Sequence, residues 1–77
     1  MKPLENYVVL KPVADEFHLD DVIVDRDDVG IVVDVNSLET VLKVGDTVIY
    51  LTPKRVKVSV NNQKRYLVER ANVMAVL

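Results

Sequence analysis

Short apolar runs rich in β-branched residues recur along the chain, separated by proline, glycine, asparagine and charged residues. Runs of this length and composition are typical of β-strands. We expect strands at Tyr7–Leu10, Val29–Val35, Thr47–Leu51, Arg55–Val60, Tyr66–Glu69 and Val73–Leu77. The pattern therefore predicts an all-β chain.

Two of these runs also predict which faces of their strands are buried. Val29–Val35 is almost continuously β-branched, which predicts a strand buried on both faces, and Gly30 within it indicates a bulge or a close backbone approach. Arg55–Val60 alternates strictly, so we expect its valines to face inward and Arg55, Lys57 and Ser59 to face outward.

Turn signals connect the runs. Asn61-Asn62 indicates a two-residue hairpin loop, since asparagine tolerates positive φ. Gly45-Asp46 indicates a tight turn, and Asn72 can cap a single helical turn before the last strand. Together these signals predict one domain, residues 1–77, folded as a small, partly open antiparallel β-barrel.

The predicted first and last strands are both apolar, and as free edges they would promote aggregation. We expect Tyr7–Lys11 of one subunit to pair with Val73–Leu77 of its neighbour, which would close a ring. The predicted subunit interface comprises Tyr7, Val8, Val9, Leu10, Val73, Met74, Ala75, Val76 and Leu77. Self-association would also stabilise a 77-residue chain that has no cysteine for disulfides.

The segment Val13–Asp28 is strongly acidic, with seven acidic residues against Arg26 alone. Such a charge density opposes collapse into a core, yet Val22-Ile23-Val24 lies at its centre. One interpretation is a solvated segment that orders when its apolar residues dock into a partner's groove. The other is a short edge strand, or a loop whose apolar residues fold back onto the barrel.

Charge is divided unevenly along the chain. Residues 1–46 contain eleven acids and four bases, whereas residues 47–77 contain one acid and six bases. This division favours head-to-tail self-association, and the basic face of residues 54–70 is the basis of an alternative, a nucleic-acid-binding barrel. Tyr50 and Tyr66 are the only aromatic residues near those bases, so a solvated face is favoured over base stacking.

Catalytic chemistry has little support. Ser37 and Ser59 lack the context of an activated nucleophile, and His18 beside acidic residues is more often solvated than a metal ligand. Asp25–Gly30 resembles the start of a calcium loop, but Val29 and Asn36 occupy ligand positions. We expect no enzyme activity, no metal and no cofactor. Without a signal peptide or a long apolar run, we also expect a cytoplasmic protein with no membrane partner.

The chain resembles the GroES-type small chaperonins, or co-chaperonins, over nearly its whole length. The similarity is carried by Lys2-Pro3-Leu4 with Val8–Pro12, by Val44-Gly45-Asp46 with Val48-Ile49-Tyr50, and by Tyr66-Leu67-Val68 with Val73–Leu77. Each piece is weak alone, but their order and spacing together are specific.

This resemblance implies a heptameric lid that docks on an ATP-loaded, GroEL-type chaperonin ring and encloses unfolded client proteins. It assigns docking to a mobile loop at residues 13–28, with Val22, Ile23 and Val24 as anchors and Asp21 and Asp25 beside them. The resemblance thus favours the docking interpretation of the acidic segment.

The chain departs from the family in two places. Asp20-Asp21 stands where the family has a glycine pair, and the connector Asn36–Lys43 is too short for the hairpin that roofs the dome. We therefore expect an open hole at the top of the ring, with Leu38, Val41 and Leu42 packed against the barrel. The missing roof, together with a shortened loop, resembles virus-encoded members, which would act in the host cytoplasm.

Overall fold

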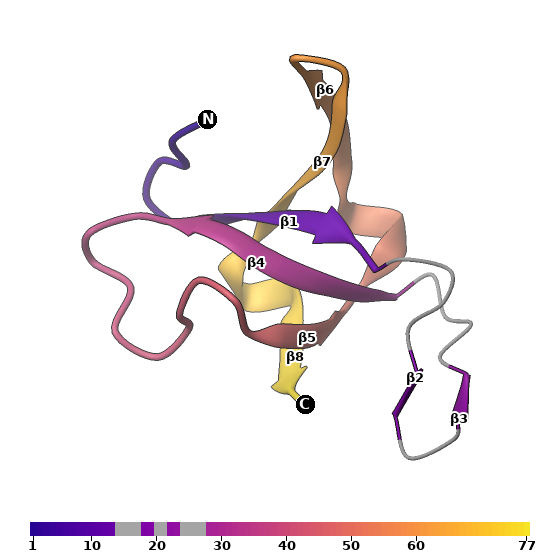
Figure 1. Cartoon of the computed structure of the whole chain (residues 1–77). Helices are drawn as coiled ribbons and strands as arrows, with labels where there is room; N and C mark the ends of the chain where they lie inside the picture. The colour runs from indigo at the N-terminus through magenta and orange to yellow at the C-terminus, as the bar shows by residue number, and fades with distance from the viewer. Residues whose placement is uncertain (14–17, 20–21, 24–27) are drawn as a thin grey trace.

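The computed structural model of the chain describes residues 1–13, 18–19, 22–23 and 28–77. In these residues, six antiparallel strands form one open sheet in the order β6-β7-β1-β4-β5-β8 (Figure 1). The strands are β1 (Tyr7–Pro12), β4 (Val29–Val35), β5 (Thr47–Tyr50), β6 (Val56–Val60), β7 (Gln63–Glu69) and β8 (Val73–Val76). The all-β prediction is confirmed, and the open sheet is compatible with a small, partly open barrel.

Short elements complete the described chain. The two-residue strands β2 (His18–Leu19) and β3 (Val22–Ile23) pair with each other in a separate sheet. Two 3-10 turns, η1 (Thr52–Lys54) and η2 (Arg70–Asn72), precede β6 and β8. The expected helical turn is thus present as η2, although Asn72 ends it and does not cap its start.

β1 lies in the middle of the sheet, hydrogen-bonded to β4 on one side and to β7 on the other. The prediction that the first strand is a free edge is therefore wrong, whereas the last strand, β8, is an edge as expected. Val8, Val9 and Leu10 are each at most 1% exposed within the single chain. A strand with three consecutive apolar residues buries both faces best at the centre of a sheet, which explains this placement.

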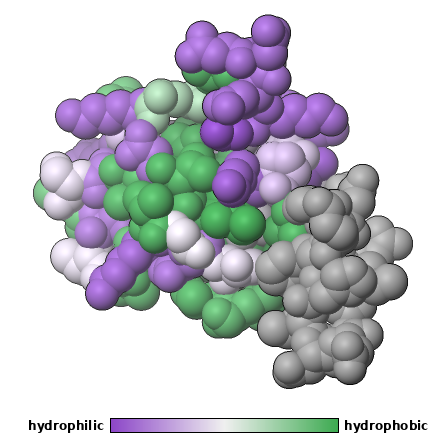
Figure 2. Space-filling view, viewed as in Figure 1, coloured by the Kyte–Doolittle hydropathy of each residue, from purple (hydrophilic) through white to green (hydrophobic). Residues whose placement is uncertain are grey.

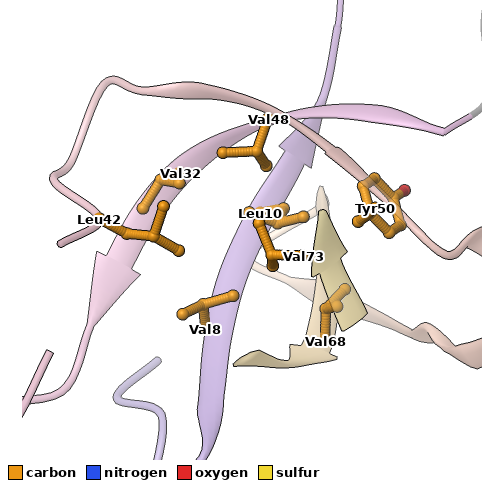
Figure 3. Packing of buried hydrophobic residues seen from close by; sticks show 8 residues of the cluster. All are labelled: Val8, Leu10, Val32, Leu42, Val48, Tyr50, Val68 and Val73. Carbon is orange, nitrogen blue, oxygen red and sulfur yellow. The ribbon is translucent and has the colours of Figure 1, made fainter. Parts of the chain in front are cut away.

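The core lies on one side of the sheet. In the view of Figure 1, β1 and β4 lie in front of the core, and β7 and β8 lie behind it. Its buried side chains come from five strands and from the connector between β4 and β5 (Figure 3). They are Val8, Leu10, Val32, Leu42, Val48, Tyr50, Val68 and Val73.

Gly30 permits the closest approach in this core. A Cβ atom added there would lie 3.2 Å from the Cβ of Leu10 and 3.3 Å from Cε1 of Tyr50. The expected close approach is confirmed, while the irregularity between β1 and β4 falls elsewhere, at Val9/Leu10. Burial of β4 on both faces holds only in part, because Ile31 and Val33 are only partly buried.

The predicted turns are present. Gly45 has φ +99°, and Oδ2 of Asp46 accepts a hydrogen bond from the backbone N–H of Lys43 at 2.9 Å. Asn61 and Asn62 have φ 51° and 63°, as a two-residue hairpin loop with two positive φ values requires.

The connector from residue 36 to residue 43 contains no strand, so no roof hairpin is present. Of its apolar residues, Leu42 is buried as expected. Leu38 and Val41 are 68% and 63% exposed, so their predicted packing against the barrel is wrong. The connector is too short to turn all three side chains toward the sheet.

Leu10→Ala should lower the free energy of unfolding by about 2–5 kcal/mol, because it leaves a cavity at a fully buried site. Urea titration followed by circular dichroism measures the change. Leu38→Ala is the matched control and should change stability by less than about 0.5 kcal/mol. Equal losses in the two variants would contradict the assignment of Leu10 to the core.

Candidate interaction surfaces

The first surface is the segment that joins β1 to β4. Its two ends are held together, because Pro12 at the end of β1 pairs with Gly30 near the start of β4. Within it, His18 pairs with Ile23 and Leu19 with Val22, and Figure 1 places this pair beyond the ends of β1 and β4. The predicted anchors Val22 and Ile23 are therefore in β3.

The remaining predicted residues of this segment, Asp21, Val24 and Asp25, lie outside the described residues. We expect residues from about Ala14 to Asp28 to be disordered or variably placed in the free protein. This remains a prediction, since residues 14–17, 20–21 and 24–27 lie outside the described residues, although the short strands β2 and β3 between them are paired.

The second surface is the free edge formed by β8, which pairs only with β5. Met74, Val76 and Leu77 are 56%, 49% and 56% exposed, and Ala75 is also exposed. No charged residue protects this edge, which makes it a template for pairing with another chain. Val73, by contrast, is buried in the core.

Of the predicted subunit interface, four exposed residues thus share the β8 edge: Met74, Ala75, Val76 and Leu77. Tyr7, Val8, Val9 and Leu10 do not belong with them. Their strand is paired on both sides, and all but Tyr7 are buried within the chain.

The third surface is the hairpin of β6 and β7, which projects above the rest of the sheet in Figure 1. Lys57 lies opposite Tyr66, which packs against the core, whereas Val56 lies opposite Leu67, on the other face of β7. The valines of β6 therefore lie on the outer face and Lys57 and Ser59 on the inner face. The predicted orientation thus holds only in part. Lys57 and Ser59 are exposed as expected and Val58 and Val60 are partly buried, but Val56 is exposed and the valines do not share the face of Tyr66.

The two tyrosines near the basic residues are engaged within the fold. Tyr50 is 1% exposed, and its hydroxyl accepts a hydrogen bond from Nη1 of Arg55 at 2.8 Å. Cζ of Arg55 lies 4.2 Å from the ring centroid of Tyr66, a cation–π contact that covers one face of that ring. The Tyr50 ring is therefore inaccessible to a nucleic-acid base, and one face of the Tyr66 ring is already occupied.

Glu39 in the connector forms contacts that the sequence analysis missed. Its Oε2 accepts hydrogen bonds from the backbone N–H groups of Val41, at 2.8 Å, and Leu42, at 3.0 Å. Its Oε1 accepts a hydrogen bond from Nε of Arg70 at 2.8 Å. These contacts fasten the connector to η2, directly before β8. Arg70 was counted only as part of the basic face, and no local sequence signal connects residues that lie 31 positions apart.

The same contacts determine the charge state of Glu39. The hydrogen bond from Leu42 N–H is the largest influence and lowers the pKa of the carboxyl group below its ordinary value. Burial opposes the shift, and the Val41 and Arg70 donors add to it. A carboxylate that accepts several hydrogen bonds is stabilised in its ionised form.

Pockets suited to a cofactor or metal are not evident in the described residues. Three shallow cavities measure about 240, 250 and 240 Å³, below the usual size of small-molecule sites. Within the described parts of the chain, no cluster of acidic, histidine or cysteine side chains is arranged to hold a metal ion. The described residues also include no helix that could span a membrane.

Neither a scan of the sequence against protein-family models nor a search among curated proteins gives a match.

Glu39→Gln should lower the free energy of unfolding by about 1–2 kcal/mol at neutral pH, because it removes the charge from a carboxylate with three donors. The lowered pKa means that this stabilisation is complete above pH 4.5, the ordinary value, and is lost as pH falls through the lower folded value.

Urea titrations between neutral pH and about pH 3 measure this difference. The gap between the parent and Glu39→Gln should close below the ordinary carboxyl pKa. The control is Glu5→Gln, at an exposed residue that lines the same shallow cavity as Glu39. The stability of this variant should equal that of the parent at each pH. A difference in stability between the parent and Glu39→Gln that stays constant with pH would contradict a stabilising role of the ionised Glu39 carboxylate.

Proposed function

We propose that the chain is a co-chaperonin, a ring-shaped lid that docks on an ATP-loaded GroEL-type chaperonin and encloses a folding protein. One observation carries the proposal: the acidic segment with Val22-Ile23-Val24 is attached at both ends to the rigid centre of the sheet, through the pair Pro12 and Gly30. A docking segment needs such a fixed base, since its movement relative to the body must not disturb the fold.

Docking rests on the apolar residues within the acidic segment. Val22, Ile23 and Val24 enter a groove on the apical part of the chaperonin, and the flanking Asp21 and Asp25 remain at its rim. Ordering the segment costs conformational entropy, so each single contact is weak. A ring presents several copies at once, which makes the combined binding strong but reversible. The lid carries out no chemistry and uses no cofactor of its own.

The ring is assembled through the apolar edge of β8, which would otherwise be exposed in the monomer. The neighbour cannot offer the edge of β1, because β4 and β7 occupy both sides of that strand. A surface other than β1 must therefore receive Met74–Leu77. The family resemblance implies a homoheptamer.

The short connector shapes the top of the lid. Because residues 36–43 form no hairpin and Glu39 holds them near η2, they border an opening at the ring axis. An opening of this kind gives an enclosed client more room.

The competing function is nucleic-acid binding by the basic residues of the β6–β7 hairpin and its flanks. Arg55 is engaged with Tyr50 and Tyr66, and Arg70 is paired with Glu39, which leaves less positive charge and less aromatic surface for a strand of bases. The lid is therefore the better-supported function.

Co-sedimentation with a chaperonin ring, with and without ATP, distinguishes the two functions. Nucleotide-dependent association supports the lid. Retention of DNA or RNA with a steep salt dependence, together with no association with the ring, would support nucleic-acid binding instead.

Ile23→Asp should abolish this association while leaving the fold intact. The substitution places an unpaired charge in an apolar groove, at a cost of several kcal/mol for each contact. The control is Val44→Asp, the same kind of change at a valine that is 65% exposed in the turn before β5. If Ile23→Asp still co-sediments like the control, the tripeptide is not the anchor.

Val76→Asp should prevent assembly of the ring, because it introduces a charge at the free apolar edge. Sedimentation velocity should change from an oligomer to a monomer, and circular dichroism should remain unchanged. Val44→Asp again serves as the control and should remain oligomeric. A parent protein that is monomeric at micromolar concentration would contradict the assembly itself.

A further inference from the structure

Among the described residues, β6 pairs only with β7, so its other edge carries no further strand. In a two-residue hairpin the residues that flank the loop, Val60 and Gln63, exchange backbone hydrogen bonds, and such pairs alternate along the ladder. The backbone groups of Val58 therefore point toward β7. Those of Lys57 and Ser59 point to the open side, where they can receive another strand.

The two faces of this edge differ in chemistry. On the outer face lie Val56, which is 53% exposed, and the partly buried Val58 and Val60. On the inner face lie Lys57 and Ser59, with Lys64 opposite Ser59 on the neighbouring strand. A strand added to this edge would meet an apolar row on one face and a basic row on the other.

The hairpin itself is basic, and an acidic residue found beside it is Asp34 of β4, which lines a cavity together with Val60 and Arg65. Residues 47–68 contain five bases and no acid. Figure 2 shows hydrophilic side chains over the projecting tip of the hairpin and a hydrophobic region over β1 and β4 below it. A shallow cavity of about 240 Å³ opens on the hairpin, lined by Lys57, Val58, Ser59, Lys64, Arg65 and Tyr66.

Lysine on an edge strand commonly prevents pairing with identical edges. Here it repels a second basic hairpin and attracts an acidic strand, so the same charge provides selectivity. The period of two along a strand then specifies the partner, with apolar residues facing the valines and acidic residues facing the lysines.

We propose that the β6 edge binds an extended segment of another protein in which acidic and apolar residues alternate, added to the sheet as a further strand. This surface is separate from the acidic segment and from the β8 edge, so its use is independent of the proposed docking on a chaperonin.

The test uses the full chain and a fluorescent peptide of about seven residues in which aspartate and valine alternate. Fluorescence anisotropy should show saturable binding that weakens as salt is added. Amide hydrogen exchange followed by NMR should show new protection at the N–H groups of Lys57 and Ser59 when the peptide is bound. No new protection at these two groups would overturn the proposal.

Reversing two exposed charges, Lys57→Glu with Lys64→Glu, should weaken binding by about tenfold or more. Lys11→Glu with Lys43→Glu, which reverses two exposed charges outside the hairpin and changes the net charge equally, is the control and should leave the affinity nearly unchanged. Equal losses in the two proteins would mean that only net charge is sensed, which would overturn the proposal.

Competing occupants give distinct results. A peptide of alternating aspartate and proline cannot form the strand ladder, so equal binding of that peptide would contradict strand addition. Concentration-dependent protection of Lys57 and Ser59 without any peptide would assign the edge to a second copy of the chain and overturn the proposal. Displacement of the peptide by a single-stranded oligonucleotide that binds more tightly would likewise overturn it in favour of nucleic acid.

Discussion

Burial of both faces of β1 is the constraint on which the remainder of the structure depends. Val8 and Leu10 contribute to the core on one face, and Val9 is buried on the other. A small chain has few positions where a strand can be covered on both sides, and the centre of the only large sheet among the described residues is the natural one. With β1 and β4 at the centre, the sheet of the described residues ends at β6 on one side and at β8 on the other.

Much of the fold could be predicted from local sequence signals. The strand at Val29–Val35, the hairpin at Asn61-Asn62 and the turn at Gly45 were all predicted correctly, because each depends on a short stretch of chain. The order of the strands was not, since hydrophobic periodicity identifies a strand but not its neighbours. An apolar first strand is compatible with the centre of a sheet and also with an edge that another subunit covers. The local pattern cannot distinguish these two positions.

For the candidate surfaces, too, features that depend on a short stretch of sequence were predicted better than contacts between distant segments. The free apolar edge of β8 was evident from Val73–Leu77, a run with no polar residue. The orientation of β6 was predicted only in part, because alternation specifies two faces of a strand but does not say which one faces the core. The Glu39–Arg70 ion pair joins distant segments and could be found only in three dimensions. Of the docking residues, only the backbone pairing of Val22 and Ile23 can be compared with the prediction.

The pairing of Pro12 with Gly30 has a consequence for how such a chain can change. The ladder between β1 and β4 ends at this pair, so the strand pairing of the sheet does not itself require a particular length of the segment that joins the two strands. The entropic cost of closing a loop rises only slowly with its length. A change in the length of this segment therefore costs the sheet little, so the specificity of the proposed docking and the stability of the body can change separately.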